Sequence, residues 1–131
     1  SAVELAAIAV SAHTNRVAVV DGHTEGVSAG FARRVRPAEA LEAYRNFETP
    51  APVANLPSTP ARPIEVDSRP DRPQPRLDVD RGTGMSVTIG RIRPCPLLDL
   101  RLVLLSHNTV RGAAGGGHQD AGALVGGGCV E

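Results

Sequence analysis

The stretch Leu97-Leu98-Asp99-Leu100-Arg101-Leu102-Val103-Leu104-Leu105 is apolar at every position except Asp99 and Arg101. A strand with one face in water alternates apolar and polar side chains, whereas a strand covered on both faces shows no such alternation. Leu97 to Leu105 is therefore predicted to be the central strand of a sheet, with the other elements arranged around it.

Three further segments are predicted to be strands. Met85 to Ile89 alternates apolar and polar residues and ends at Gly90-Arg91, and Thr24 to Phe31 alternates in the same way. A period of two is typical of strands with one buried face. Asn15 to Val20 is predicted to be a short buried strand that is followed by a turn at Asp21-Gly22.

One helix is predicted to begin at Pro37, because proline suits the first helical position. Its apolar stripe ends near Glu48, and the region from Phe31 to Phe47 holds both phenylalanines and the only tyrosine of the chain. Aromatic side chains bury the most area per residue, so this region is expected to be the most densely packed. The Ala-rich run Val3–Val10 permits a second helix. The stripe of the first helix consists of Ala40, Leu41, Tyr44 and Phe47.

The rest of the chain is rich in proline or glycine. Residues 49–76 form a proline-rich excursion that includes a short strand at Ile64–Val66, and the glycine-rich tail 115–131 is a poor helix former. Prolines lower the entropy cost of ordering, so an ordered excursion is expected. Together these elements predict one α+β domain over residues 1–131, with a mixed, largely antiparallel sheet and helices on one face.

Composition excludes several classes of function. The 14 basic and 14 acidic residues give a net charge of zero, which argues against a broad nucleic-acid footprint. Every basic residue is an arginine, so lysine-dependent chemistry is excluded within this chain. The chain contains no run of 18 apolar residues, which is about the length a membrane-spanning helix needs, so no membrane span is expected. Cys95 and Cys129 are too few for a disulfide framework, which favours a cytoplasmic location. No metal is expected, because the histidines and cysteines lack metal-ligand spacing.

Four segments, in order along the chain, resemble one family of enzymes. These segments are Asn15-Arg16-Val17 with Asp21-Gly22-His23-Thr24-Glu25, the run Arg69–Asp78 (RPDRPQPRLD), Gly84-Met85 with Val87–Arg93, and Leu105–Gly116 (LSHNTVRGAAGG). They are similar to the corresponding segments of aspartate-semialdehyde dehydrogenases of the archaeal and fungal type, and they span most of the chain.

The resemblance implies the catalytic and dimerisation domain of that family, with the fold of a glyceraldehyde-3-phosphate-dehydrogenase-like C-terminal domain. It implies an oxidoreductase of lysine, threonine and methionine biosynthesis that interconverts L-aspartate 4-semialdehyde and 4-aspartyl phosphate with NADP. In this family a cysteine attacks the aldehyde, a hydride passes to NADP, and phosphate releases the acyl group. The N-terminal NADP-binding domain and the cysteine lie outside the resemblance, so the chain alone is expected to be inactive.

Three residues are carried over from the family by their motifs. His23 is implied to be the general base, and histidine is the side chain that titrates near neutral pH. Arg16, seven positions earlier, is implied to bind the substrate carboxylate, for which a guanidinium fork is suited. Asn108 is implied to contact the cofactor. Each has a plainer alternative: a solvated histidine at a turn, an arginine paired with Asp21 or Glu25, and an asparagine that caps a helix.

Partners and rival functions follow from the same comparison. A small-molecule substrate, a homodimer or tetramer and possibly a separate N-terminal half are expected, without nucleic acid or membrane. A related acyl-CoA or semialdehyde reductase is an alternative within the same chemistry. A non-catalytic dimerisation or interaction fragment is an alternative from another class, favoured by the glycine run that replaces the family's apolar helix after Gly116.

Overall fold

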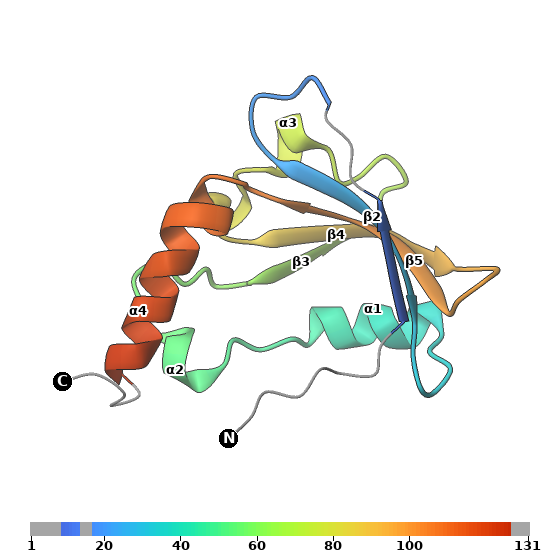
Figure 1. The fold of residues 1–131 in the computed structure, drawn as a ribbon, viewed down its shortest axis with the longest axis horizontal. Helices are drawn as coiled ribbons and strands as arrows, with labels where there is room; N and C mark the ends of the chain where they lie inside the picture. The colour runs from blue at the N-terminus through green and yellow to red at the C-terminus, as the bar shows by residue number, and fades with distance from the viewer. Residues whose placement is uncertain (1–8, 14–16, 127–131) are drawn as a thin grey trace.

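The computed structural model describes residues 9–13 and 17–126 of the chain (Figure 1). Five strands form one sheet in the order β1-β2-β5-β4-β3. The strands are β1 (Ala9–His13), β2 (His23–Gly30), β3 (Ile64–Asp67), β4 (Val87–Pro94) and β5 (Leu100–Ser106). The helices are α1 (Pro37–Arg45), α2 (Ala51–Ala54), α3 (Pro75–Asp78) and α4 (Gly116–Gly126), with a 3-10 turn at Arg81–Gly84 and a π-helix at Val110–Gly115.

The central strand was predicted correctly. β5 is the third of five strands and is antiparallel to both neighbours, β2 and β4. Leu102 and Leu105 lie on opposite faces of β5, and both are buried. The parallel pair β3 and β4 is the only departure from antiparallel pairing among the described strands. The predicted α+β class is confirmed: α1 packs beneath β3 and β4, and the short α3 lies on the other side of the sheet (Figure 1).

The most densely packed region is not where the aromatic residues lie. Phe31 is 41% exposed and Phe47 is 47% exposed, so the prediction for this region is wrong. Phe31 follows the last residue of β2, and Phe47 lies just beyond the end of α1. β4 and β5 instead have strands on both sides and supply most of the buried apolar residues. The core consists of Ala40, Met85, Ile89, Leu100, Leu102 and Leu105.

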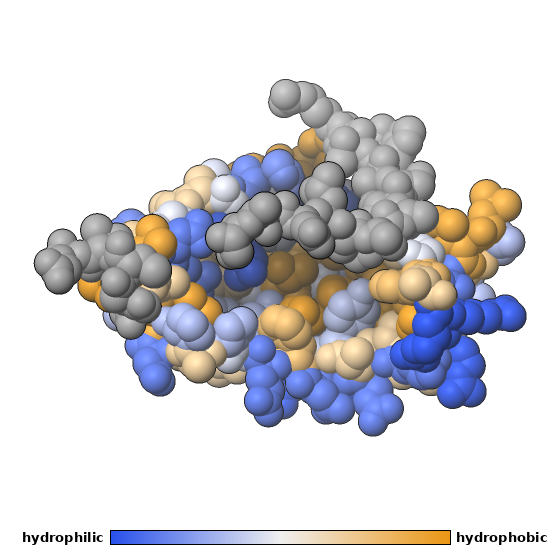
Figure 2. All heavy atoms as spheres, turned by 60° about the horizontal axis from the view of Figure 1, so that its bottom comes forward, coloured by the Kyte–Doolittle hydropathy of each residue, from blue (hydrophilic) through white to orange (hydrophobic). Residues whose placement is uncertain are grey.

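The underside of the molecule is hollowed (Figure 2). Apolar side chains gather inside the hollow, and charged side chains line its lower rim in this view. Apolar side chains gathered on a surface of this kind often mark a site of interaction with a partner.

The predicted strand over Asn15–Val20 is wrong for the part that the structure describes. Residues 17–22 form a loop, and Val20 is 98% exposed. β1 pairs with β2 only as far as the couple His13 and Gly26, and the outer part of β2 pairs with β5 alone. The loop therefore crosses the end of the sheet and turns at Gly22 directly into β2. Most of the Val3–Val10 run lies outside the described residues.

Part of the glycine-rich tail forms a helix although glycine has a low helix propensity. α4 extends over Gly116–Gly126 and packs against α2 and the segment that follows it. The Gln119 side chain donates to the Thr59 hydroxyl at 3.1 Å. A Cβ at Gly122 would lie 2.8 Å from Leu56 Cδ1, so a glycine permits this close approach. Tertiary contacts thus outweigh local propensity here.

A network of ion pairs organises the later part of the excursion. Asp78 is 1% exposed, accepts hydrogen bonds from the Gln74 N–H at 2.7 Å and from Arg72, and forms an ion pair with Arg81 at 2.7 Å. Arg81 also contacts Asp67 of β3 at 2.7 Å. The network extends to Arg69 at 2.5 Å from Asp67 and to Glu65 at 3.1 Å from Arg81. The network ties α3 to β3, at the edge of the sheet.

Acid is expected to weaken this network. The hydrogen bonds from Arg69 and Arg81 hold the pKa of Asp67 far below its usual range despite its burial. A carboxylate with a lowered pKa stabilises the fold above the pKa of the unfolded chain, near 4, and this contribution is lost as the pH falls towards the folded pKa. Unfolding by urea should show Asp67→Asn to be less stable than the wild type at pH 7, with the gap narrowing towards pH 3. A gap of constant size would contradict the prediction.

Candidate active site

The turn at Gly22 and His23 leads the loop into β2. Gly22 is buried and has a φ of +103°, a conformation that side chains disfavour. A Cβ at this position would lie 3.0 Å from Leu105 Cδ1 and 3.1 Å from Val79 Cγ2. The turn is therefore pressed against β5 and the end of α3. His23 follows as the first residue of β2, opposite Ser106, with an exposed side chain.

Asn108 reaches this turn from the segment after β5. The backbone N–H of Gly22 donates to Asn108 Oδ1 at 2.8 Å, across 86 positions of sequence. The pairing of His23 with Ser106 explains the encounter, because it places Asn108 two residues beyond the partner of His23. Two of the three predicted site residues, His23 and Asn108, are thus brought together.

The helix-cap alternative for Asn108 is wrong in this structure. The N-cap of the π-helix is Thr109, which forms no side-chain cap bond. The backbone N–H of Val110 instead donates to His107 Nδ1 at 3.4 Å. The side chain of Asn108 is directed to Gly22, so its role is tertiary.

His107 was missed as a structural element of the site. Its ring is 7% exposed, and its Nδ1 lies 3.2 Å from the Thr109 hydroxyl. Arg111 donates to the carbonyl of Met85 at 2.7 Å. Both contacts anchor the turn that presents Asn108. The only sequence signal was the adjacency of these residues in the SHNT motif, which does not distinguish a buried histidine from an exposed one.

Arg16 lies outside the described residues, so its predicted proximity to His23 stays a prediction. Glu25 follows His23 by two residues and lies on the same face of β2. Within the described part of the chain, Glu25 and His23 form no hydrogen bond with each other.

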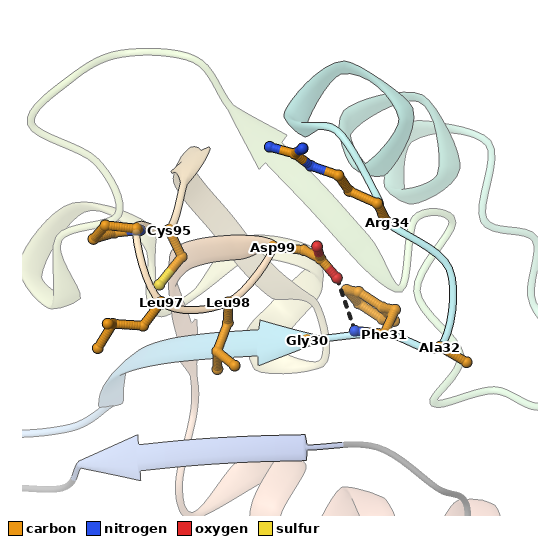
Figure 3. Close-up of a pocket in the computed structure, with 9 residues that line it drawn as sticks. Gly30, Phe31, Ala32, Arg34, Cys95, Leu97, Leu98 and Asp99 are labelled. Atoms are coloured by element: carbon orange, nitrogen blue, oxygen red, sulfur yellow. Dashed lines mark hydrogen bonds between the residues drawn. The ribbon is translucent and has the colours of Figure 1, made fainter.

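A cavity of about 510 Å³ lies at the other end of β2 (Figure 3). Asp99 Oδ2 accepts the N–H of Phe31 at 2.8 Å beside it, and Cys95 and Leu97 line it. Hydrogen bonds from the backbone N–H groups of Leu97 and Leu98 lower the pKa of the Cys95 thiol. Because β2 separates this cavity from His23, it is not part of the candidate active site.

Comparison with known proteins places these motifs in a family. The pattern described as the semialdehyde dehydrogenase dimerisation domain matches residues 1–111. The chain belongs to this family. Among the curated relatives, the aspartate-semialdehyde dehydrogenase of Candida albicans is 50% identical over 110 residues, which are 82% of this chain and 30% of that protein. The enzyme of the same name from Archaeoglobus fulgidus is 49% identical over 123 residues, which are 94% of this chain and 35% of that protein.

Solved structures of semialdehyde dehydrogenases have the same fold. The crystal structure of the Candida albicans enzyme with NADP aligns with a TM-score of 0.77 at 44% identity, covering 88% of this chain and 33% of that one. Aspartate semialdehyde dehydrogenase II from Vibrio cholerae aligns with a TM-score of 0.66 at 23% identity over 84% of this chain and 29% of that one, which shows the fold alone. The chain spans about a third of the length of the relatives it matches.

The resemblance inferred from the four motifs is therefore confirmed. As a member of the semialdehyde dehydrogenase dimerisation-domain family, the chain has close relatives that are oxidoreductases by name. None of the helices in the described residues is long and apolar enough to cross a membrane.

Proposed function

We propose that this chain supplies the general base and the substrate-binding residues of an NADP-dependent aspartate-semialdehyde dehydrogenase. The observation that carries the proposal is the Gly22–His23 turn, in which the Gly22 N–H donates to Asn108 Oδ1 at 2.8 Å. The chain belongs to a family whose curated relatives are named aspartate-semialdehyde dehydrogenase. In this proposal residues 1–131 form one catalytic and dimerisation domain, which acts with a nucleotide-binding half in the cytoplasm.

His23 is proposed to hold and move the proton. Its imidazole is exposed at the start of β2, where a second domain or a substrate has access to it. It accepts the proton released when the nucleophile adds to the aldehyde, and it returns a proton in the reverse direction. The buried Gly22 turn directs the base without burying it.

Arg16 is proposed to bind the α-carboxylate of the substrate. A guanidinium group donates two parallel hydrogen bonds to a carboxylate, which fixes the orientation as well as the charge of the substrate. The negative substrate would be held by a charge of opposite sign seven positions from the base.

Asn108 fits a contact with the nicotinamide. Its Oδ1 accepts the N–H of Gly22, while its amide nitrogen has no hydrogen-bond partner among the described residues. NADP would supply the hydride acceptor when it is bound. Most of the binding energy for NADP would come from the nucleotide-binding half.

A second copy of the chain is proposed as the partner that covers the remaining apolar surface. Leu97 is 89% exposed and the underside is hollowed and apolar (Figure 2). A homodimer, or a tetramer built from dimers, would bury such surface, as the dimerisation domain in the family description suggests.

Joining the chain to a nucleotide-binding half tests the proposal. Fused behind the N-terminal part of the Archaeoglobus fulgidus relative, the chain should support reduction of NADP that depends on aspartate semialdehyde and phosphate. The 131-residue chain alone should show no such activity. A folded fusion that acts on an acyl-CoA substrate instead would favour the reductase alternative, and one without any activity would favour the non-catalytic fragment.

The variant Arg16→Lys in the same fusion tests the carboxylate contact. Lysine keeps the charge but loses the bidentate fork, so the KM for the semialdehyde should rise about tenfold or more, while the KM for NADP stays unchanged. Arg45→Lys, in the last turn of α1, is the matched control. An unchanged KM for the semialdehyde in Arg16→Lys would remove Arg16 from the site.

A further inference from the structure

The Gly22–His23 turn is held at His23 by the pairing of this residue with Ser106 of β5, and at Gly22 by one hydrogen bond to a side chain outside the loop. The preceding residues 17–20 are exposed, and the loop is not a strand, so the sheet does not hold it. On one side Gly22 meets Leu105 and Val79, and a Cβ here would lie 3.0 Å and 3.1 Å from their side chains, closer than an ordinary van der Waals contact. Apolar contact limits where the turn lies but does not fix its rotation, because dispersion contacts have no preferred direction.

Before the β2–β5 pairing that begins at His23, the directional contact to the turn comes from Asn108. Its Oδ1 accepts the Gly22 N–H at 2.8 Å, which is a short and well-placed bond. Gly22 is buried, so water does not readily replace this acceptor, and an unsatisfied buried N–H is costly. This N–H belongs to the peptide between Asp21 and Gly22, and the next peptide along the chain joins Gly22 to His23.

Asn108 is itself held firmly. The ring of His107, the residue before Asn108, is buried and accepts the N–H of Val110. A Cβ at Gly84 would lie 2.9 Å from the His107 ring, so this ring is packed closely on the chain that leads into β4. Three residues after Asn108, the Arg111 guanidinium donates a hydrogen bond to the backbone carbonyl of Met85. A side chain on such a frame can fix a loop, which a side chain on a mobile segment cannot.

We infer that Asn108 is a positioning residue that orients His23 through its carbonyl oxygen, whatever its amide nitrogen contributes to cofactor binding. This inference rests on the proposed function for its catalytic consequence, but not for the contact itself. One amide group would then link two parts of the site: Oδ1 holds the turn of the base, and Nδ2 is left for a ligand.

Two substitutions distinguish the role of the amide oxygen of Asn108 from the role of its amide nitrogen. Asn108→Asp keeps an oxygen that accepts the Gly22 N–H but loses the donor, whereas Asn108→Ala loses both. In the 131-residue chain, amide hydrogen exchange at Gly22 followed by NMR should speed up about tenfold or more in Asn108→Ala and stay within about threefold of wild type in Asn108→Asp. Asn46→Ala, at the exposed C-terminal cap of α1, is the control and should change nothing at Gly22.

The same variants in the active fusion give a kinetic readout. If Oδ1 orients the base, Asn108→Ala should lower kcat about tenfold and Asn108→Asp should recover most of that loss, even where the KM for NADP rises in both. Equal exchange at Gly22 in wild type and Asn108→Ala, or Asn108→Asp as poor in kcat as Asn108→Ala, would overturn the inference. A fusion without activity would count against the proposed function, and the exchange measurement would still decide whether Asn108 holds the turn.

Discussion

Asp78→Ala is expected to lower the free energy of unfolding by about 3–5 kcal/mol, because removal of one partner from a buried ion-pair network leaves the opposite charges without compensation. The Asp78 side chain is fully buried, and its neighbours Arg72 and Arg81 have side chains only 11% and 23% exposed. Without Asp78, the Arg72 guanidinium and the N–H of Gln74 lose this buried acceptor, and Arg81 is left with its ion pairs to Asp67 and Glu65.

Chemical denaturation of the 131-residue chain measures this effect. The matched control is Asp71→Ala, since Asp71 lies in the same segment but is exposed and accepts only from the Gln74 side chain at 3.0 Å. That substitution should cost less than about 0.5 kcal/mol. Equal losses for the two variants would mean that burial of Asp78 has no energetic consequence. Because Val79 contacts Gly22, the Asp78 variant should also disturb the turn that carries His23.

His23→Ala is expected to have the largest effect on catalysis. Loss of a general base lowers rates by about 10²–10⁴-fold. In the fusion with a nucleotide-binding half, kcat should fall by that factor, while the KM for NADP stays within about twofold. Stability should hardly change, because the His23 side chain is exposed and forms no hydrogen bond among the described residues.

His118→Ala provides the matched control for this experiment. His118 is also exposed, lies in α4, and its Nδ1 contacts the carbonyl oxygen of Ala114 at 2.8 Å. Its removal should leave kcat within about twofold of wild type. If His23→Ala kept wild-type kcat, or if both variants lost activity equally, the assignment of His23 as the base would be wrong.

The elements that could be predicted are those with a strong local pattern. Leu97–Leu105 and Thr24–Phe31 yielded β5 and β2, and Pro37 marked the first residue of α1. The motif around His23 also indicated a turn correctly, because a glycine before a strand is a local signal. The elements that failed lacked such support. Val17, Val19 and Val20 resemble a strand, but residues 17–22 form a loop and Val20 is 98% exposed.

The site was predicted less completely than the fold. His23 and Asn108 were named separately, and neither composition nor spacing indicated that Asn108 would accept the N–H of Gly22, because 86 residues separate them. Burial of His107 and of Asp78 was also not predictable. A charged or polar residue in a loop is usually exposed, and only its partners from other segments reverse that expectation.

By itself the sequence determined the class of the fold, its central strand, the family and the residues with suitable chemistry, because these depend on local periodicity and on short motifs. The tertiary structure alone decided which of them meet. The antiparallel register of β2 and β5 brings Asn108 to the Gly22 turn, and the buried carboxylate of Asp78 holds α3 where Val79 presses on the same glycine. Such contacts depend on how strands align in space, and residues far apart in the chain carry no local record of that alignment.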